Sequence, residues 1–283
     1  MEPGFSLKDA NVAVVGLGLM GGSLALSVKS KCRRLSAFDP DLATLELARR
    51  QEIVHLADSD PAKALVGADL VILACPVPSI LRWIERLPEF IQHPCIVLDL
   101  GSSKRTIVAA LKALPANFDP LGGHPICGRE RLSLENAERF LYRDAPFVLT
   151  PLPRTTDRAR AAALQLVEAL GSRPLWLDAA SHDRILAATS HLPYLLSSAL
   201  ALATPEEAAP LVGPGFRSSA RLAGTPSSMM LGVLQSNRDN VLDAIGRLQE
   251  QLAAIKSALL TNNPDQLRAA LDKAQSHYRT LIQ

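Results

Sequence analysis

A glycine-rich motif near the N-terminus constrains the fold of this chain more than any other feature. The motif has the form G-x-G-x-x-G and consists of Gly16, Leu17, Gly18, Leu19, Met20 and Gly21. An apolar run at 12–15 precedes it and a helical pattern follows it, so a strand is expected to turn into a helix here. The first glycine makes the tight turn, the second lets the backbone approach a pyrophosphate, and the third allows close packing of helix on strand. We therefore expect these residues to bind the phosphates of a dinucleotide at the helix N-terminus.

Asp39 and Pro76 are expected to complete the cofactor site. Asp39 ends the next apolar run, at 35–39. A carboxylate there accepts hydrogen bonds from the adenosine ribose and repels a 2′-phosphate, so it favours NAD over NADP. The alternative is an ordinary turn residue before Pro40. Pro76 follows the run at 70–74 and is expected to line the same crevice, although a strand exit blocked by prolines explains it nearly as well.

Short apolar runs alternate with helical patterns through the first half of the chain. They predict strands at 11–16, 35–39, 70–74, 96–99 and 118–122, with helices between them at 21–31, 42–51, 79–86 and 103–114. This alternation favours a parallel doubly wound sheet. Two further strands, at 146–150 and 174–177, are expected to flank a helix at 156–170 that ends at Gly171. Residues 1–178 are thus predicted to form an α/β dinucleotide-binding domain of the doubly wound, Rossmann type.

The composition changes after Asp178. From 179 to 283 the chain is rich in Ala, Leu, Ser and Gln at helical spacing, which predicts an all-α C-terminal domain. Helices this apolar need a surface to pack on, and a second copy of the chain is the simplest one. We expect residues 179–283 to bind substrate and to form a homodimer.

Charge and cysteine content argue against several classes of protein. The 283 residues carry 30 Lys and Arg against 28 Asp and Glu, and only 4% are aromatic, so nucleic-acid binding has little support. No apolar run approaches the roughly 20 residues that span a bilayer, and no membrane association is expected. The N-terminus lacks the features of a signal peptide, and the four cysteines are scattered without a C-x-x-C pair. These features favour a cytoplasmic protein with free thiols.

Two motifs that follow predicted strands carry reactive side chains. The first, at 99–104, reads D-L-G-S-S-K; Ser102 is expected to point its hydroxyl into the crevice and Ser103 to cap the next helix. The second, at 122–128, reads G-G-H-P-I-C-G. Its glycines let the backbone approach a ligand, and Pro125 biases His124 toward an extended conformation, so the imidazole is expected on a stiff loop.

With these motifs the chain resembles the prephenate/arogenate dehydrogenase family of tyrosine biosynthesis. The resemblance covers almost the whole chain. It rests on four segments in the same order, which are 99–104, 122–128, Ser190-His191-Leu192-Pro193, and the run G-F-R-S-S-A-R-L-A at 215–223.

The resemblance implies an NAD-dependent oxidative decarboxylation, of prephenate to 4-hydroxyphenylpyruvate or of arogenate to tyrosine. It implies that His124 takes the proton of the substrate ring hydroxyl and that Ser102 bonds the same hydroxyl beside the nicotinamide. His191 and Arg221 match substrate-binding positions, and Arg221 should meet a carboxylate. Arg217 precedes Arg221 by four residues, so both can lie on one helix face; Arg217 is either a second substrate contact or a solvated residue.

The chemistry independently asks for these residue types. Forming a carbonyl from an alcohol needs a base whose pKa lies near the working pH, and imidazole supplies one. A dianionic substrate needs a fixed cation, and guanidinium pairs with carboxylate in a bidentate manner. Decarboxylation driven by aromatisation needs no metal. His124 and Cys127 have ligand spacing but no second ligand pair accompanies them, so no metal site is expected.

Several alternatives remain open. Family members often carry a Thr after the His-Pro segment, whereas this chain has Arg129, Glu130 and Arg131, and the preference between prephenate and arogenate stays undecided. His182 and Asp183 start a helical segment and are interpreted as a helix-start ion pair rather than as catalytic residues. The rival functions are another two-domain dehydrogenase, of the β-hydroxyacid dehydrogenase or imine reductase type, and a non-catalytic NAD-binding sensor.

Overall fold

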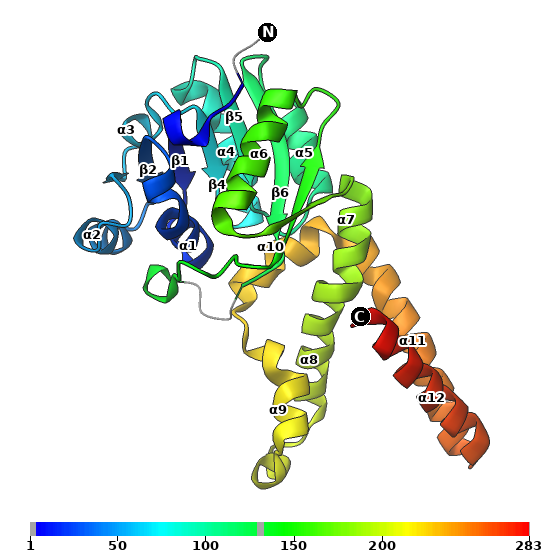
Figure 1. Cartoon of the computed structure of the whole chain (residues 1–283). Coiled ribbons are helices and arrows are strands. Elements are labelled where there is room, and N and C mark those ends of the chain that lie inside the picture. The colour runs from blue at the N-terminus through cyan, green and yellow to red at the C-terminus, as the bar shows by residue number, and fades with distance from the viewer. Residues whose placement is uncertain (1–3, 129–132, 283) are drawn as a thin grey trace. The chain divides into compact units, whose positions relative to one another are not determined.

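The protein is described by a computed structural model that covers residues 4–128 and 133–282 (Figure 1). The chain divides into two compact units, Met1–Asn237 and Arg238–Gln283. The first contains a single eight-stranded sheet with helices on both faces, followed by further helices, so the predicted doubly wound α/β fold and the helical region after it are confirmed. The boundary predicted at 178 stays a prediction.

The sheet has the strand order β3-β2-β1-β4-β5-β6-β7-β8. Its strands are β1 (Asn11–Val15), β2 (Arg34–Phe38), β3 (Leu56–Asp58), β4 (Leu70–Leu73), β5 (Cys95–Asp99), β6 (Phe118–Pro125), β7 (Pro146–Pro151) and β8 (Arg173–Trp176). The first six pair in parallel, β7 runs antiparallel to β6, and β8 pairs in parallel with β7. The chain therefore builds the sheet outward from β1 on one side through β2 and β3, and then on the other side from β4 onward. Open α/β sheets bind their ligands at this switch in strand order, beside the carboxyl ends of the strands.

Two hydrophobic clusters cover the two faces of the sheet. Along β1, Val12 and Val14 belong to one cluster and Ala13 and Val15 to the other, as the two-residue period of a strand buried on both faces requires. The helices packed in these layers are α1 (Leu19–Val28) and α6 (Asp157–Leu170) on one face, and α4 (Val77–Phe90) and α5 (Arg105–Lys112) on the other. The carboxyl ends of β1, β4 and β5 are thereby fixed between two apolar layers.

The predicted elements recur with two differences of substance. The short pair β3 and α3 (Pro61–Leu65), which follows α2 (Leu42–Arg50), was not predicted, because three- and five-residue elements carry too little periodicity. The strand predicted at 118–122 continues to Pro125, so His124 lies in β6 and not on a loop. The cause is the antiparallel ladder with β7, in which His124 is the partner of Val148. The predicted end of α6 at Gly171 is confirmed by its left-handed φ of 72°.

Beyond β8 the first unit is helical. Its helices are α7 (Ala179–Leu186), a π-helical turn (Ala187–His191), α8 (Leu192–Ala203), α9 (Pro214–Ala220) and α10 (Ser227–Ser236). Short 3-10 helices lie at Leu7–Asp9, Lys29–Lys31, Leu134–Asn136, Glu206–Leu211 and Arg221–Gly224. The π-helical turn stands just before Pro193, which cannot donate a helical hydrogen bond.

The continuous helical run Ala179–Ala203 is long and apolar enough to cross a membrane by length and composition alone. No apolar run of membrane-spanning length was expected from the sequence, so this helix differs from that expectation. His182, Asp183 and His191, which lie on it, are buried within the first unit.

The second unit is a helical hairpin of α11 (Arg238–Leu260) and α12 (Pro264–Leu281), which pack along each other. The turn between them is closed by Asn263, whose side chain accepts a hydrogen bond from the Gln266 backbone N–H at 3.0 Å and so caps α12.

Candidate active site

The glycine motif forms the turn that its sequence predicts. Gly16 has a φ of 100°, a region that side chains disfavour, and a Cβ on Gly21 would lie 1.9 Å from the Gly16 carbonyl oxygen. Helix α1 begins at Leu19, with Gly18 at the N-cap position and no side chain capping it. The N–H groups of this first turn therefore lack helical partners, and they fit the pyrophosphate of a dinucleotide. Gly16, Gly18, Leu19, Met20 and Gly21 all lie in this turn.

Asp39 contacts the same turn. Its Oδ2 accepts a hydrogen bond from the Leu17 N–H at 2.8 Å and its Oδ1 accepts one from the Asp41 N–H at 2.9 Å. The carboxylate is only half-buried, and each oxygen has a further lone pair for a ribose hydroxyl. Pro76 precedes α4 at the exit of β4, and a Cβ on Gly16 would touch the neighbouring Ala74 and Cys75. Both residues thus lie at the sheet edge that carries the glycine turn.

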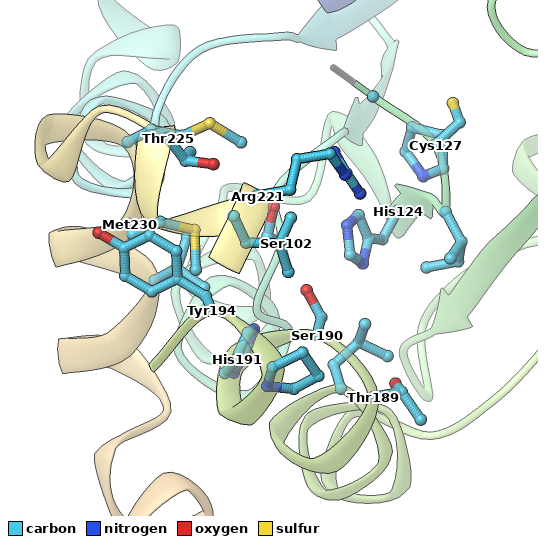
Figure 2. Close-up of a pocket in the computed structure, with 18 residues that line it drawn as sticks. Ser102, His124, Cys127, Thr189, Ser190, His191, Tyr194, Arg221, Thr225 and Met230 are labelled. Atoms are coloured by element: carbon cyan, nitrogen blue, oxygen red, sulfur yellow. The ribbon is translucent and has the colours of Figure 1, made fainter. Parts of the chain in front are cut away.

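A cavity of about 450 Å³ contains four of the predicted site residues: Ser102, His124, His191 and Arg221. The first and last of them, Ser102 and Arg221, lie 119 positions apart in the chain, yet Figure 2 shows the four side chains around one space, with Arg221 and His124 directed toward the same region. The rest of the lining is mostly apolar and includes Leu186, Met230 and Val233. A few polar groups in an apolar cavity are typical of a site that orients a small ligand.

Asp99 and Lys104 fix the backbone just before each of the two catalytic candidates, Ser102 and His124. Asp99 accepts hydrogen bonds from the Gly101 N–H at 2.8 Å and from the Gly123 N–H at 3.1 Å. The Lys104 ammonium donates to Asp99 and, at 2.7 Å, to the Gly123 carbonyl. Ser102 and His124 are the next residues after these two glycines, so one buried ion pair fixes the segments that present both.

The prediction that Ser103 caps α5 (Arg105–Lys112) is wrong, because the cap comes from Asp183. Ser103 does not cap the helix, and its hydroxyl instead lies 2.7 Å from the Ser236 hydroxyl. The carboxylate of Asp183, from α7, accepts hydrogen bonds from the N–H groups of Lys104 at 2.6 Å and Arg105 at 2.9 Å. A capping residue 78 positions away in the chain leaves no local sequence signal.

His124 is nearly buried, and its Nδ1 lies 2.8 Å from the Nε2 of His182. The Nδ1 of His182 in turn lies 2.8 Å from the Asp183 carboxylate. Burial lowers the pKa of His124 well below its usual value, and His182, Lys104 and His191 lower it further. His124 is therefore neutral at pH 7 and able to act as a base.

His191 is 1% exposed and stands between the cavity and Asn237. The Asn237 amide nitrogen donates to the Asp183 carbonyl at 2.7 Å and lies 3.2 Å from the His191 Nδ1. Because an amide nitrogen only donates, the His191 Nδ1 accepts and its Nε2 carries the hydrogen. That Nε2 is buried without a hydrogen-bond partner in the described residues. Burial lowers the pKa of His191 to about 4, so it offers a neutral donor to a ligand.

The two arginines separate. Arg221 lies in a 3-10 helix and lines the cavity, whereas Arg217 is exposed on α9 and is not part of the lining. Arg129, Glu130 and Arg131 lie outside the described residues. Across 4–128 and 133–282, no three His, Cys, Asp or Glu side chains gather as a metal site requires.

Sequence reasoning gave no site role to Asp99, Lys104, His182, Asp183 or Asn237. Asp99 and Lys104 stood within a recognised motif, but their contact with Gly123 depends on the pairing of β5 with β6. His182 and Asp183 form a dipeptide that suits a helix start, and only the tertiary fold brings it to His124. The available signal was the clustering of ionisable residues in an otherwise apolar helix.

Comparison with known proteins agrees with this architecture. Residues 24–175 match the family model for the prephenate dehydrogenase nucleotide-binding domain, and residues 178–273 match that for the prephenate dehydrogenase dimerization domain. A prephenate dehydrogenase from Bacillus subtilis is 28% identical over 89% of this chain and 70% of its own length. The prephenate dehydrogenase of Aquifex aeolicus, solved with hydroxyphenyl propionate and NAD+, is 25% identical with a TM-score of 0.90, covering 98% of this chain and all of that one. The arogenate dehydrogenase of Synechocystis is 27% identical with a TM-score of 0.82, covering 96% and 99% of the two chains. The two family models together span nearly the whole chain, which therefore belongs to the prephenate dehydrogenase family.

Proposed function

We propose that this chain carries out the reaction of its family, with His124 as the base. The reaction is the NAD-dependent oxidative decarboxylation of a cyclohexadienol, prephenate or arogenate, and the protein is an oxidoreductase of the prephenate/arogenate dehydrogenase type. NAD, when bound, accepts the hydride that leaves the ring carbon bearing the hydroxyl. Every other part of the reaction falls to the side chains of the cavity.

His124 takes the proton from the ring hydroxyl as hydride leaves the same carbon, which becomes a carbonyl carbon. The bond to the ring carboxylate then breaks, CO2 departs, and the electron pair of that bond makes the ring aromatic. The oxygen becomes a phenolate and takes the proton back from His124, so the enzyme ends in its starting state. A neutral, buried imidazole suits both transfers, because it binds a proton only when the substrate presents one.

Three further residues orient the substrate. Ser102 gives a hydroxyl beside His124, where it can bond the same ring oxygen. Arg221 offers a guanidinium for a substrate carboxylate, and the His191 Nε2–H, which has no partner in residues 4–128 and 133–282, offers a neutral hydrogen bond. Arg217 remains a predicted substrate contact from outside the cavity.

The observation that carries the proposal is the convergence of Ser102, His124, His191 and Arg221 on one cavity at the sheet edge. The test is to supply prephenate or arogenate with NAD and to follow NADH by its absorbance. His124→Asn should lower kcat by roughly 10²–10⁴, the range for lost acid–base catalysis, while NAD binding persists. His93→Asn is the matched control, because His93 bonds the Ala68 carbonyl away from the cavity. Turnover of neither substrate, or native kcat in His124→Asn, would contradict the proposal.

We also propose that the protein is a cytoplasmic homodimer joined through its helical region. The support is a set of exposed large apolar side chains on the helices: Leu196, Leu202, Leu231, Leu242, Leu252, Leu259 and Leu271. The run Ala179–Ala203 serves in this proposal as a wall of the cavity rather than as a membrane span, because Thr189, His191 and Tyr194 from it line that cavity. Sedimentation equilibrium without detergent tests the dimer, and a monomer at micromolar concentration would contradict it.

A further inference from the structure

A continuous line of hydrogen bonds joins Asp183 to His124. The His182 Nδ1 lies 2.8 Å from the Asp183 Oδ1, and the His182 Nε2 lies 2.8 Å from the His124 Nδ1. The side chains of His182 and Asp183 have no exposed surface. Only His124, at the far end, reaches the cavity.

The donors and acceptors in this line have a defined order. An ionised carboxylate only accepts, so the His182 Nδ1 carries a hydrogen and donates it to Asp183. The Nε2 of a neutral His182 is then an acceptor, and it receives the hydrogen of the His124 Nδ1. The remaining ring nitrogen of His124, Nε2, is left with a lone pair. That nitrogen is the one the substrate hydroxyl requires.

Asp183 is itself fixed in place and in charge. Burial raises its pKa, but the hydrogen bonds from His182 and from the N–H groups of Arg105 and Lys104 outweigh burial and bring the pKa below its ordinary value. Because those two N–H groups belong to the first turn of α5, the carboxylate also sits at the positive end of a helix dipole.

We propose that His182 and Asp183 are positioning residues, which hold His124 in the tautomer whose Nε2 accepts the substrate proton. This inference rests on the proposed function of His124. When His124 takes the proton of the ring hydroxyl, its Nδ1–H keeps its bond to His182, and the carboxylate of Asp183 stabilises the positive charge through that bond. The proton returns from Nε2 to the phenolate oxygen, and His182 and Asp183 exchange no proton in the cycle.

Asp183→Asn tests the order of the hydrogen bonds. With its amide oxygen in the place of Oδ2, the asparagine still accepts from the Arg105 N–H, while its NH2 group stands in the place of Oδ1, which accepts from both the Lys104 N–H and His182 in the native protein. In this orientation the bond from Lys104 is lost and the NH2 group makes the His182 Nδ1 an acceptor. The His182 Nε2 then carries the hydrogen, and His124 is forced to place its own hydrogen on Nε2. We expect kcat to fall on the order of 10²–10⁴-fold, as for a catalytic histidine held in the wrong tautomer, with KM changed only a few-fold.

The matched control is Asp178→Asn. Asp178 also caps a helix with its carboxylate, accepting from the N–H groups of Ala180 at 3.0 Å and Ser181 at 2.9 Å. Its backbone carbonyl accepts from the His182 N–H at 2.9 Å, a contact that the substitution keeps, but its carboxylate bonds no histidine ring among the described residues. Its kcat should stay within a few-fold of native. A similar loss in both variants would mean that Asp183 is only a helix cap, and would overturn the proposal.

A readout independent of activity is the ¹⁵N NMR spectrum of the protein labelled in its histidine rings, with the His124 signals assigned by their loss in His124→Asn. The native protein should show His124 with hydrogen on Nδ1, and Asp183→Asn should show it on Nε2. Hydrogen on Nε2 in the native protein would overturn the inference even if Asp183→Asn does not fold. Should neither substrate turn over, the proposed function fails, while the spectrum still decides whether His182 and Asp183 set the tautomer.

Discussion

The ammonium of Lys104 is paired with the carboxylate of Asp99, and neither side chain has any exposed surface. Burial lowers the pKa of Lys104, and the contact with Asp99 opposes that shift. The pair also bonds the backbone on both sides of Gly123, so it joins the exit of β5 to the part of β6 that presents His124. A buried charge is costly without its partner, and the two residues depend on each other for that reason.

Lys104→Met should therefore destabilise the protein strongly. The substitution leaves the Asp99 carboxylate buried without a counter-ion, and loss of one partner of a buried pair costs about 3–5 kcal/mol. Urea unfolding followed by circular dichroism measures this loss. Lys63→Met is the control, because Lys63 is exposed and lies 3.9 Å from Asp58; such a surface pair is worth about 0–1 kcal/mol. Equal decreases in the free energy of unfolding of the two variants would show that the buried pair stabilises the protein no more than the surface pair does.

Local patterns predicted most of the fold because the sheet is buried on both faces. Apolar runs such as 70–74 and the glycine motif at 16–21 record the strand ends directly in the sequence. The strand containing His124 was cut short at Gly122, because two glycines and a proline disfavour a strand locally. Pairing with β7 overrides that preference, and β7 lies more than 20 residues further on.

The candidate site likewise contains residues that local motifs predict and residues whose role depends on the tertiary fold. Ser102, His124, His191 and Arg221 stand in local motifs, and the fold brings them to one cavity. Asp183 acts through contacts with α5 and with His182, which connect segments 78 residues apart. No local rule assigns a carboxylate in α7 as the cap of α5, so its role becomes visible only in three dimensions.

Asp39 should control both cofactor affinity and cofactor choice. Asp39→Ser removes the carboxylate proposed to bond the ribose and also the acceptor of the Leu17 N–H. We expect weaker NAD binding and a smaller preference for NAD over NADP, since the repulsion of a 2′-phosphate is lost. The ratio of kcat/KM for the two cofactors measures this.

Asp41→Ser provides the comparison for Asp39. Asp41 caps α2 by accepting from the Thr44 N–H at 3.0 Å and does not bond the glycine turn. Serine is itself a good N-cap, so both stability and the NAD to NADP ratio should hold. Equal kcat/KM for NAD and NADP in the native protein would contradict the role given to Asp39.

Arg221→Ala should act mainly on KM. A guanidinium that pairs with a substrate carboxylate makes the same contact in the ground and transition states, and its loss costs on the order of 1.5–3 kcal/mol. Arg217→Ala serves as the companion variant. Arg217 is exposed and does not line the cavity, so its removal should raise KM less than that of Arg221. Steady-state kinetics with varied substrate at saturating NAD measures both KM values. An unchanged KM in Arg221→Ala would mean that Arg221 does not bind the substrate.

As the pH is lowered, the free energy of unfolding should begin to fall at about pH 6.5, whereas kcat/KM should fall only at a lower pH. The base His124 must be neutral, and its pKa is lowered first by burial and then by His182, Lys104 and His191. The acid limb of kcat/KM should therefore have its midpoint below the unperturbed value of about 6.5. A midpoint at or above that value would mean that burial does not govern His124 or that another group takes the proton.

The pH dependence of the free energy of unfolding should come from two buried histidines, His124 and His191. In the unfolded chain both bind protons near pH 6.5, whereas in the folded protein the pKa of His191 is about 4 and that of His124 is also lowered, in both cases chiefly by burial. Because the unfolded state binds more protons across this interval, the free energy of unfolding should fall as the pH drops from about 6.5 toward 4. Urea unfolding at a series of pH values measures the slope, and His191→Asn should reduce it, since an amide does not titrate. A slope that is unchanged in this variant would show that His191 is protonated equally in the folded and unfolded states.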